Sequence, residues 1–162
     1  MSRLDHPGVR RVQAALREKG SHAGIILLQE TARSAEDAAR ALGVEQGAIV
    51  KSLVFLIDGR PVMALVAGDR RCDTSALAAA FRRPGLVTRP DADRVREATG
   101  FSIGGVAPLA HPRPLPTVID DSLGRFETIY AAAGHPFCVF PTTVLELSLL
   151  TGGSVVKALA AP

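Results

Sequence analysis

The stretch that decides the fold reads IVKSLVFLIDGRPVMALVA and runs from Ile49 to Ala67. Two apolar, β-rich runs, Ile49 to Ile57 and Val62 to Ala67, flank the pair Asp58-Gly59. Asp-Gly between two such runs is a strong signal for a β-hairpin, because the tight turn needs residues that tolerate positive φ angles. The sequence therefore predicts a hairpin here.

Helix start and stop signals surround this hairpin. Serine, threonine or aspartate at an N-cap accepts hydrogen bonds from the first turn, and glycine tolerates the left-handed conformation that ends many helices. Glu146 is also placed to complete a capping box. These signals predict helices from Pro7 to Lys19, from Ser34 to Gly43, from Asp73 to Phe81, from a cap within Thr88 to Asp91 up to Gly100, and from Thr142 to Gly152.

Shorter apolar runs predict further strands at Ile25 to Leu28, Leu86 to Thr88, Thr117 to Asp120, Glu127 to Ala131, and Phe137 to Phe140. Gly134-His135-Pro136 has the composition of a turn. Several strands follow one another without a crossover helix, which favours an α+β fold over a doubly wound parallel sheet. At 162 residues, 47% of them apolar, the chain has the size of one domain. We therefore expect residues 1–162 to form a single α+β domain, a mixed β-barrel-like sheet with surrounding helices.

The composition excludes several classes of protein. The longest strongly apolar run ends at Asp58 and is far shorter than the roughly 20 residues that span a bilayer, so no membrane partner is expected. The N-terminus lacks the basic-then-apolar layout of a signal peptide, which predicts a cytoplasmic protein. A net charge of +3 without a long basic run allows a local phosphate contact and argues against a surface for DNA.

No metal centre and no cofactor are predicted. Cys72 and Cys138 are too few for a disulfide framework and are far apart in the sequence. Metal ligands in proteins usually have close spacing, which is missing from the histidines, His6, His22, His111 and His135. No nucleophile-elbow motif supports a Ser-His-Asp triad.

Lys51 is the most informative single residue. Alternation along the predicted strand places it on the same face as Ile49, Leu53, Phe55 and Ile57, and the opposite face is apolar too. An unpaired buried ammonium is costly. Lys51 therefore either reaches solvent past the strand, finds an anionic partner, or serves a binding site.

The segment Phe101 to Pro116 contains adjacent glycines and four prolines, which predicts a long, partly stiffened loop. Gly104-Gly105 allows the backbone to approach a ligand closely and to point N–H groups at it, although a simple turn is the other interpretation. The loop lacks the residues of a Walker or dinucleotide motif. His135 has two interpretations as well: a solvated turn residue or a functional one.

Five stretches resemble the YbaK/ProX family of aminoacyl-tRNA editing domains, which is related to the insertion domain of prolyl-tRNA synthetase. They are Ile49 to Phe55, Ala67 to Arg71, Ala98 to Pro108, Ile119 to Leu123, and Ala133 to His135. No single motif is diagnostic, but the five occur in the family's order.

The resemblance implies a mixed β-barrel-like α+β fold and a metal-independent enzyme that hydrolyses the ester of a mischarged tRNA. It implies that Lys51 is the hallmark functional residue and that the loop from Gly104 to Pro108 shapes the catalytic pocket. Ala110 stands where many relatives have glycine. The full set of site residues that it implies is Lys51, Gly104, Gly105 and His135 as catalytic residues, and Ser102, Val106, Pro108, Asp69 and Arg70 as substrate-binding residues.

The expected mechanism needs no protein nucleophile. The N–H groups of Gly104 and Gly105 would stabilise the tetrahedral oxyanion while water attacks the ester. The implied partners are the acceptor end of an aminoacyl-tRNA, often tRNA for proline, and prolyl-tRNA synthetase. Small wrong amino acids such as alanine, 2-aminobutyrate or cysteine are the expected cargo. The alternative is a non-catalytic module of the same fold that binds tRNA or a synthetase.

Overall fold

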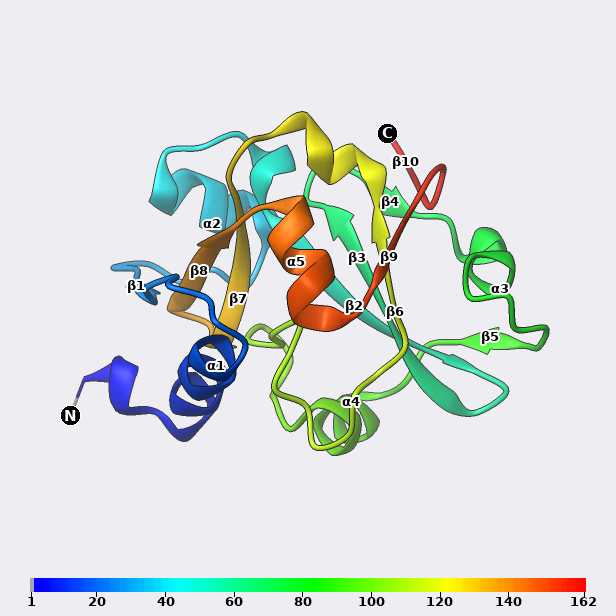
Figure 1. Cartoon of the computed structure of the whole chain (residues 1–162), viewed down its shortest axis with the longest axis horizontal. Coiled ribbons are helices and arrows are strands. Elements are labelled where there is room, and N and C mark those ends of the chain that lie inside the picture. The colour runs from blue at the N-terminus through cyan, green and yellow to red at the C-terminus, as the bar shows by residue number, and fades with distance from the viewer. Residues whose placement is uncertain (1) are drawn as a thin grey trace.

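The computed structural model describes residues 2–162, and the predicted hairpin lies at its centre (Figure 1). Strand β2 (Val50–Ile57) pairs antiparallel with β3 (Arg60–Ala67) along the full length of both. Asp58 and Gly59 have φ angles of 49° and 78°. Positive φ at both central positions suits a tight turn that matches the twist of the strands. The hairpin prediction is confirmed.

The hairpin is the middle of a mixed five-stranded sheet in the order β5-β2-β3-β6-β9. The short strand β5 (Val87–Thr88) pairs antiparallel with the end of β2. On the other side, β6 (Thr117–Asp120) runs parallel to β3, and β9 (Ser154–Val156) runs parallel to β6. The strand β9 was not among the predicted elements.

A second sheet has the order β1-β8-β7, formed by β1 (Ile26–Leu27), β8 (Cys138–Thr142) and β7 (Ile129–His135). A third pairing joins β4 (Arg71–Cys72) to β10 (Ala160–Ala161), which was also not predicted. Because β7 continues through His135, the turn before β8 lies at Pro136 and Phe137 and not at Gly134 to Pro136 as predicted.

The α+β fold class with a mixed sheet and surrounding helices is confirmed, but the sheets do not close into a barrel. Within residues 2–162, a single parallel bridge, between Ile49 and Tyr130, links the residue before β2 to β7. A closed barrel needs a continuous ladder between all neighbouring strands. Ile49, just before β2, meets β7, and Leu56 and Ile57 of β2 meet β5, so the edge of β2 between these points is open within residues 2–162.

In the described residues, five α-helices surround the sheets: α1 (Pro7–Glu18), α2 (Ala35–Leu42), α3 (Leu77–Ala80), α4 (Ala92–Thr99) and α5 (Val144–Thr151). Side chains of Ser34, Asp91 and Thr143 accept hydrogen bonds from N–H groups of the first turns of α2, α4 and α5. These caps confirm the predicted helix starts. In Figure 1, α1 lies below β7, against which it packs, and α5 lies in front of the large sheet.

Two predicted helix details differ from the structure. The helix predicted from Asp73 begins as a 3₁₀ turn, Thr74–Ala76, before α3. Glu146 does not complete a capping box, because its carboxylate accepts hydrogen bonds from the hydroxyl groups of Thr142 (2.8 Å) and Ser21 (3.3 Å). In the described part of the chain, no helix has the length and apolar character needed to cross a bilayer.

The hairpin separates two hydrophobic cores. Val50, Val54 and Leu65 face the larger core, with side chains from α1, α5 and the second sheet. Phe55, Ile57 and Val66 face a smaller core with residues of α3 and the C-terminal segment. Ile49, which precedes β2, packs instead with Ala38 and Ala39 of α2.

Candidate active site

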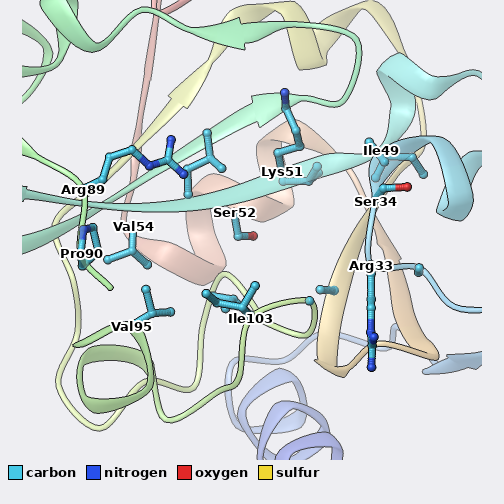
Figure 2. Close-up of a pocket in the computed structure, with 17 residues that line it drawn as sticks. Arg33, Ser34, Ile49, Lys51, Ser52, Val54, Arg89, Pro90, Val95 and Ile103 are labelled. Atoms are coloured by element: carbon cyan, nitrogen blue, oxygen red, sulfur yellow. The ribbon is translucent and has the colours of Figure 1, made fainter. Parts of the chain in front are cut away.

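A pocket of about 410 Å³ lies along the open edge of β2. Figure 2 shows Val54 directed toward Val95 and Ile103, which come from α4 and from the loop that follows it. Most of the surrounding side chains are apolar. The lining residues are Ala32, Arg33, Ser34, Ala35, Ile49, Val50, Lys51, Ser52, Leu53, Val54, Arg89, Pro90, Val95, Ile103, Gly104, Val106 and Ala132. We call this the edge pocket.

The open edge supplies backbone donors to the edge pocket. The Asp58 N–H donates to the Leu86 carbonyl oxygen on the β5 side of the strand, at 2.9 Å. Backbone groups of alternate residues point to the same side of a strand, so those of Ser52 and Val54 also point to this side. No strand among residues 2–162 pairs with them there. The gap that prevents barrel closure therefore creates a site with free N–H and C=O groups.

Ser52 is a functional candidate that sequence reasoning missed. Its side chain points toward Ile103 in Figure 2. The Ser52 hydroxyl oxygen is the one buried side-chain polar atom within residues 2–162 that has no hydrogen-bond partner. Such a group costs about 1–3 kcal/mol, a penalty that a bound ligand could relieve. The available signal was a polar residue between Val50 and Val54 on a core-facing strand surface.

Lys51 points to the opposite side of β2 from Ser52, as Figure 2 shows. This agrees with the predicted alternation, because Phe55 and Ile57 lie on the same face. The Lys51 ammonium donates to the carbonyl oxygen of Arg70. Burial lowers the pKa of Lys51 below its ordinary value, and the nearby charge of Arg71 lowers it further, while Cys72 and Asp69 act in the other direction.

Lys51 has no acidic partner in the part of the chain that the structure describes: no carboxylate oxygen lies within 4.0 Å of its ammonium. Asp69 is held by the guanidinium of Arg125 in two hydrogen bonds of 2.7 and 3.0 Å. Asp69 and Arg70 thus lie near Lys51 and do not line the edge pocket. Of this group, Arg70 contacts Lys51 through its backbone.

The glycine loop forms the wall opposite β2, but its two glycines have different surroundings. Gly104 lines the edge pocket at a φ of 95°, and its N–H has no hydrogen-bond partner within residues 2–162. The Gly105 N–H donates to the Ser102 carbonyl oxygen at 3.1 Å. It is therefore not free to bind an oxyanion, contrary to the sequence-based expectation.

Gly105 instead allows close packing. A Cβ atom at this position would lie 2.9 Å from the backbone N and 3.0 Å from the Cα of His135. The loop can rest on the end of β7 only because Gly105 has no side chain. Among the other loop candidates, Val106 lines the edge pocket, and Pro108 is buried and does not line it.

His135 lies on the other side of the glycine loop from the edge pocket. It lines a second hollow together with Ser102 and Gly105. Its Nδ1 accepts a hydrogen bond from the Phe137 N–H at 3.1 Å. Burial lowers the pKa of His135, and His6, Arg3 and Arg33 lower it further. The structure therefore divides the predicted site residues between two hollows and a cluster around Lys51.

The described residues offer neither a cluster of metal ligands nor a reactive thiolate. Residues 2–162 hold no group of three or more His, Cys, Asp or Glu side chains that could bind a metal ion. Burial raises the pKa of Cys72 to about 11, and it also raises that of Cys138. Both thiols are therefore protonated near neutral pH and are weak nucleophiles.

An α+β fold with a pocket between a strand lysine motif and a glycine loop fits the family resemblance of the five motifs. The chain belongs to the aminoacyl-tRNA editing domain family, which its residues 29–148 match. The family recognised from those motifs is thus confirmed.

Similar proteins include YwhH of Bacillus subtilis, an uncharacterised protein that is 33% identical over 121 residues, or 74% of this chain and 76% of YwhH. EbsC of Enterococcus faecalis, named as a candidate Cys-tRNA(Pro)/Cys-tRNA(Cys) deacylase, is 30% identical over 102 residues, or 62% of each chain. A crystal structure described as a candidate trans-editing enzyme for prolyl-tRNA synthetase has a TM-score of 0.86 and 39% identity, covering 93% of this chain and 96% of that one.

Proposed function

We propose that this chain is a trans-editing deacylase that hydrolyses the ester between a small wrong amino acid and the terminal adenosine of tRNA for proline. The support from relatives is the family match together with the printed names of EbsC and of the prolyl-tRNA synthetase trans-editing candidate. The observation that carries the proposal is the edge pocket, which among the described residues combines a partnerless Ser52 hydroxyl, the unbonded N–H of Gly104 and mostly apolar walls.

The edge pocket suits a small acyl group. Its volume of about 410 Å³ accommodates an aminoacyl group such as alanyl, 2-aminobutyryl or cysteinyl and part of the adenosine. The Ser52 hydroxyl would bond a polar atom of the aminoacyl group. Apolar walls separate side chains that differ by one methylene by only about 1–3 kcal/mol, so discrimination among these cargoes is expected to be modest.

The proposed reaction is direct attack by water. A water oxygen adds to the ester carbonyl carbon, and the negative charge on the carbonyl oxygen is stabilised by the N–H groups of Gly104 and Ser52. The carbon–oxygen bond to the ribose then breaks, and the ribose oxygen takes the proton that water loses. The products are a free amino acid and an uncharged tRNA.

Lys51 contributes charge in this scheme. One of its three N–H donors goes to the Arg70 carbonyl oxygen, which leaves two for a substrate. We place these donors at a phosphate or ribose oxygen of the acceptor end, on the side of β2 away from Ser52. His135 would act from the second hollow and not at the ester.

The second candidate function is a non-catalytic binding module. The specific observation in its favour is that the edge pocket, as formed by the described residues, is lined by no Asp, Glu or His that could act as a general base. In the deacylase proposal, the substrate's own neighbouring hydroxyl group must help to position the water.

Single-turnover deacylation distinguishes the two candidates. Enzyme in excess is mixed with tRNA for proline that carries labelled alanine, 2-aminobutyrate or cysteine, with prolyl-tRNA as the control. The deacylase proposal expects at least one mischarged tRNA to be hydrolysed well above its spontaneous rate and prolyl-tRNA to be spared. Tight binding of these tRNAs without hydrolysis of any of them would establish the binding module instead.

A further inference from the structure

The second hollow has a volume of about 540 Å³ and lies between the start of α1, the glycine loop and the end of β7. We call it the basic hollow. Its lining side chains include three arginines and two histidines, and no Asp or Glu from the described residues is among them. The basic residues are Arg3, His6, Arg11, Arg33 and His135.

Two of the arginines, Arg3 and Arg11, are held in place without being neutralised. The Arg3 guanidinium lies 3.9 Å from the ring centre of Phe137, and that of Arg11 lies 4.7 Å from the ring centre of Phe101. Arg11 also donates to the Gly100 carbonyl oxygen at 2.6 Å. Over residues 2–162, neither these two arginines nor Arg33 form an ion pair with a carboxylate.

The two histidines add further donors. Their ring centres are 4.9 Å apart. The Nδ1 atoms of His6 and His135 each accept a backbone N–H, from Gly8 and Phe137, at 3.1 Å. A neutral imidazole that accepts at Nδ1 carries its hydrogen on Nε2, so each ring keeps one donor for a ligand. Burial lowers the pKa of His135, and the charges of His6, Arg3 and Arg33 lower it further.

A site that offers donors from guanidinium and imidazole groups recognises an anion with several acceptor oxygens. Arginine forks match phosphate oxygens in pairs. The rings of Phe101 and Phe137 are each covered by a guanidinium, so they are not free to stack on a base. The chemistry therefore favours recognition of a phosphate backbone over recognition of bases.

The basic hollow adjoins the edge pocket, since Arg33, Ile103 and the glycine loop line both. We infer that the basic hollow binds the phosphodiester backbone of the last nucleotides of the acceptor strand while the aminoacyl ester occupies the edge pocket. This inference rests on the proposed function. It assigns a separate role to each site: the edge pocket binds the amino acid, and the basic hollow binds the nucleic acid independently of its sequence.

The test uses the unacylated trinucleotide CCA with a 5′-phosphate, whose binding to the full-length protein is measured by NMR titration at several salt concentrations. Arg3→Gln and Arg33→Gln remove one charge each, and the double variant removes both. Arg60→Gln is the matched control, because Arg60 is an exposed arginine beside the hairpin turn. A CCA analogue with neutral methylphosphonate linkages and no 5′-phosphate tests whether phosphate is the group recognised. Thermal melting confirms that each variant is folded.

We expect the double variant to bind CCA roughly 10-fold more weakly. Its salt slope should fall by about 0.7 for each phosphate that an arginine no longer neutralises, as for single strands. Arg60→Gln should bind like the wild type, and the neutral analogue should not distinguish the wild type from the double variant. Wild-type affinity and salt slope in the folded double variant would overturn the inference, as would equal binding of the charged and neutral probes.

The single-turnover deacylation assay runs alongside as an independent measurement. If the wild type hydrolyses no aminoacyl-tRNA but CCA binding depends on Arg3 and Arg33, the proposed function fails and the phosphate site stands. If hydrolysis occurs and CCA affinity does not depend on Arg3 or Arg33, the proposed function stands and the inferred phosphate site is refuted.

Discussion

The edge pocket and the basic hollow lie on opposite sides of the same glycine loop, yet their chemistry differs. The edge pocket has mostly apolar walls and one partnerless hydroxyl, whereas the basic hollow is lined by five basic side chains. Apolar contacts can select an amino acid by its size but provide little affinity for tRNA. Phosphate contacts provide affinity without regard to the amino acid. In the proposed function, the backbone of the glycine loop therefore separates the site that selects the amino acid from the site that provides affinity for tRNA.

The largest effect on activity is expected from a change in the glycine loop that separates the two sites. Gly105→Ala introduces a methyl group 2.9 Å from the backbone of His135, which cannot move aside without displacing β7. We expect single-turnover deacylation to fall about 100-fold, the cost of a site displaced by about 1 Å, and CCA binding to weaken as well.

Gly124→Ala is the matched control, because a Cβ atom there would meet no other atom within 4 Å. It should keep the wild-type rate. A wild-type rate in Gly105→Ala would show that the loop is not a rigid partition between the two hollows.

Lys51→Ala tests whether the strand lysine serves the substrate. Its ammonium bonds only a backbone carbonyl oxygen among the described residues, so its removal should leave the fold intact. The expected loss in deacylation is roughly 10-fold or more, which corresponds to one hydrogen bond from a charged group. The rate is measured under single-turnover conditions, with Lys19→Ala, a change at an exposed lysine, as the control. An unchanged rate would make Lys51 a structural residue.

Ser52→Ala should change activity and stability in opposite directions. Removing a buried hydroxyl that lacks a partner should raise the free energy of unfolding by up to about 1 kcal/mol, while deacylation falls about 3- to 10-fold. Denaturant unfolding and single-turnover rates measure the two effects. Ser148→Ala serves as the contrast, because the Ser148 hydroxyl donates to the Gly153 carbonyl oxygen at 2.6 Å and its loss should destabilise the protein. A destabilised Ser52→Ala would contradict the assignment.

The smallest expected effect is that of a chelator. Protein treated with EDTA, freed of chelator and assayed in magnesium-containing buffer should deacylate at its original rate, because neither hollow offers a cluster of metal ligands within residues 2–162. Elemental analysis should find no stoichiometric zinc. If EDTA treatment abolished deacylation and added zinc restored it, the proposed mechanism would have to be replaced.

Local signals predicted the elements that depend on local chemistry. The positive φ angles of Asp58 and Gly59 and the caps at Ser34 and Asp91 are properties of a few neighbouring residues, and the sequence displays them. The strands β9 and β10 were missed because they are short and pair with residues far away in the chain, such as Val118 and Cys72.

The candidate site was predicted only in part, for a similar reason. Lys51 stands out in the sequence because a charge in an apolar strand is unusual, whereas a serine in a strand is ordinary. Ser52 becomes notable only because the neighbouring strand edge is open, which is a property of the whole fold. Ala110, where many relatives were expected to have glycine, has a φ of 67° and so occupies a conformation that glycine adopts more easily.

The open edge of β2 also has a consequence for solubility. An unpaired strand edge flanked by apolar side chains is a template on which another chain can add a strand, the first step of many aggregation processes. Charged side chains and proline at such an edge discourage this addition. The edge pocket has both, in Lys51 and Arg89 and in Pro90, which has no N–H to donate. Lys51, Arg89 and Pro90, which line the edge pocket, thus also hinder another chain from pairing with the open edge of β2.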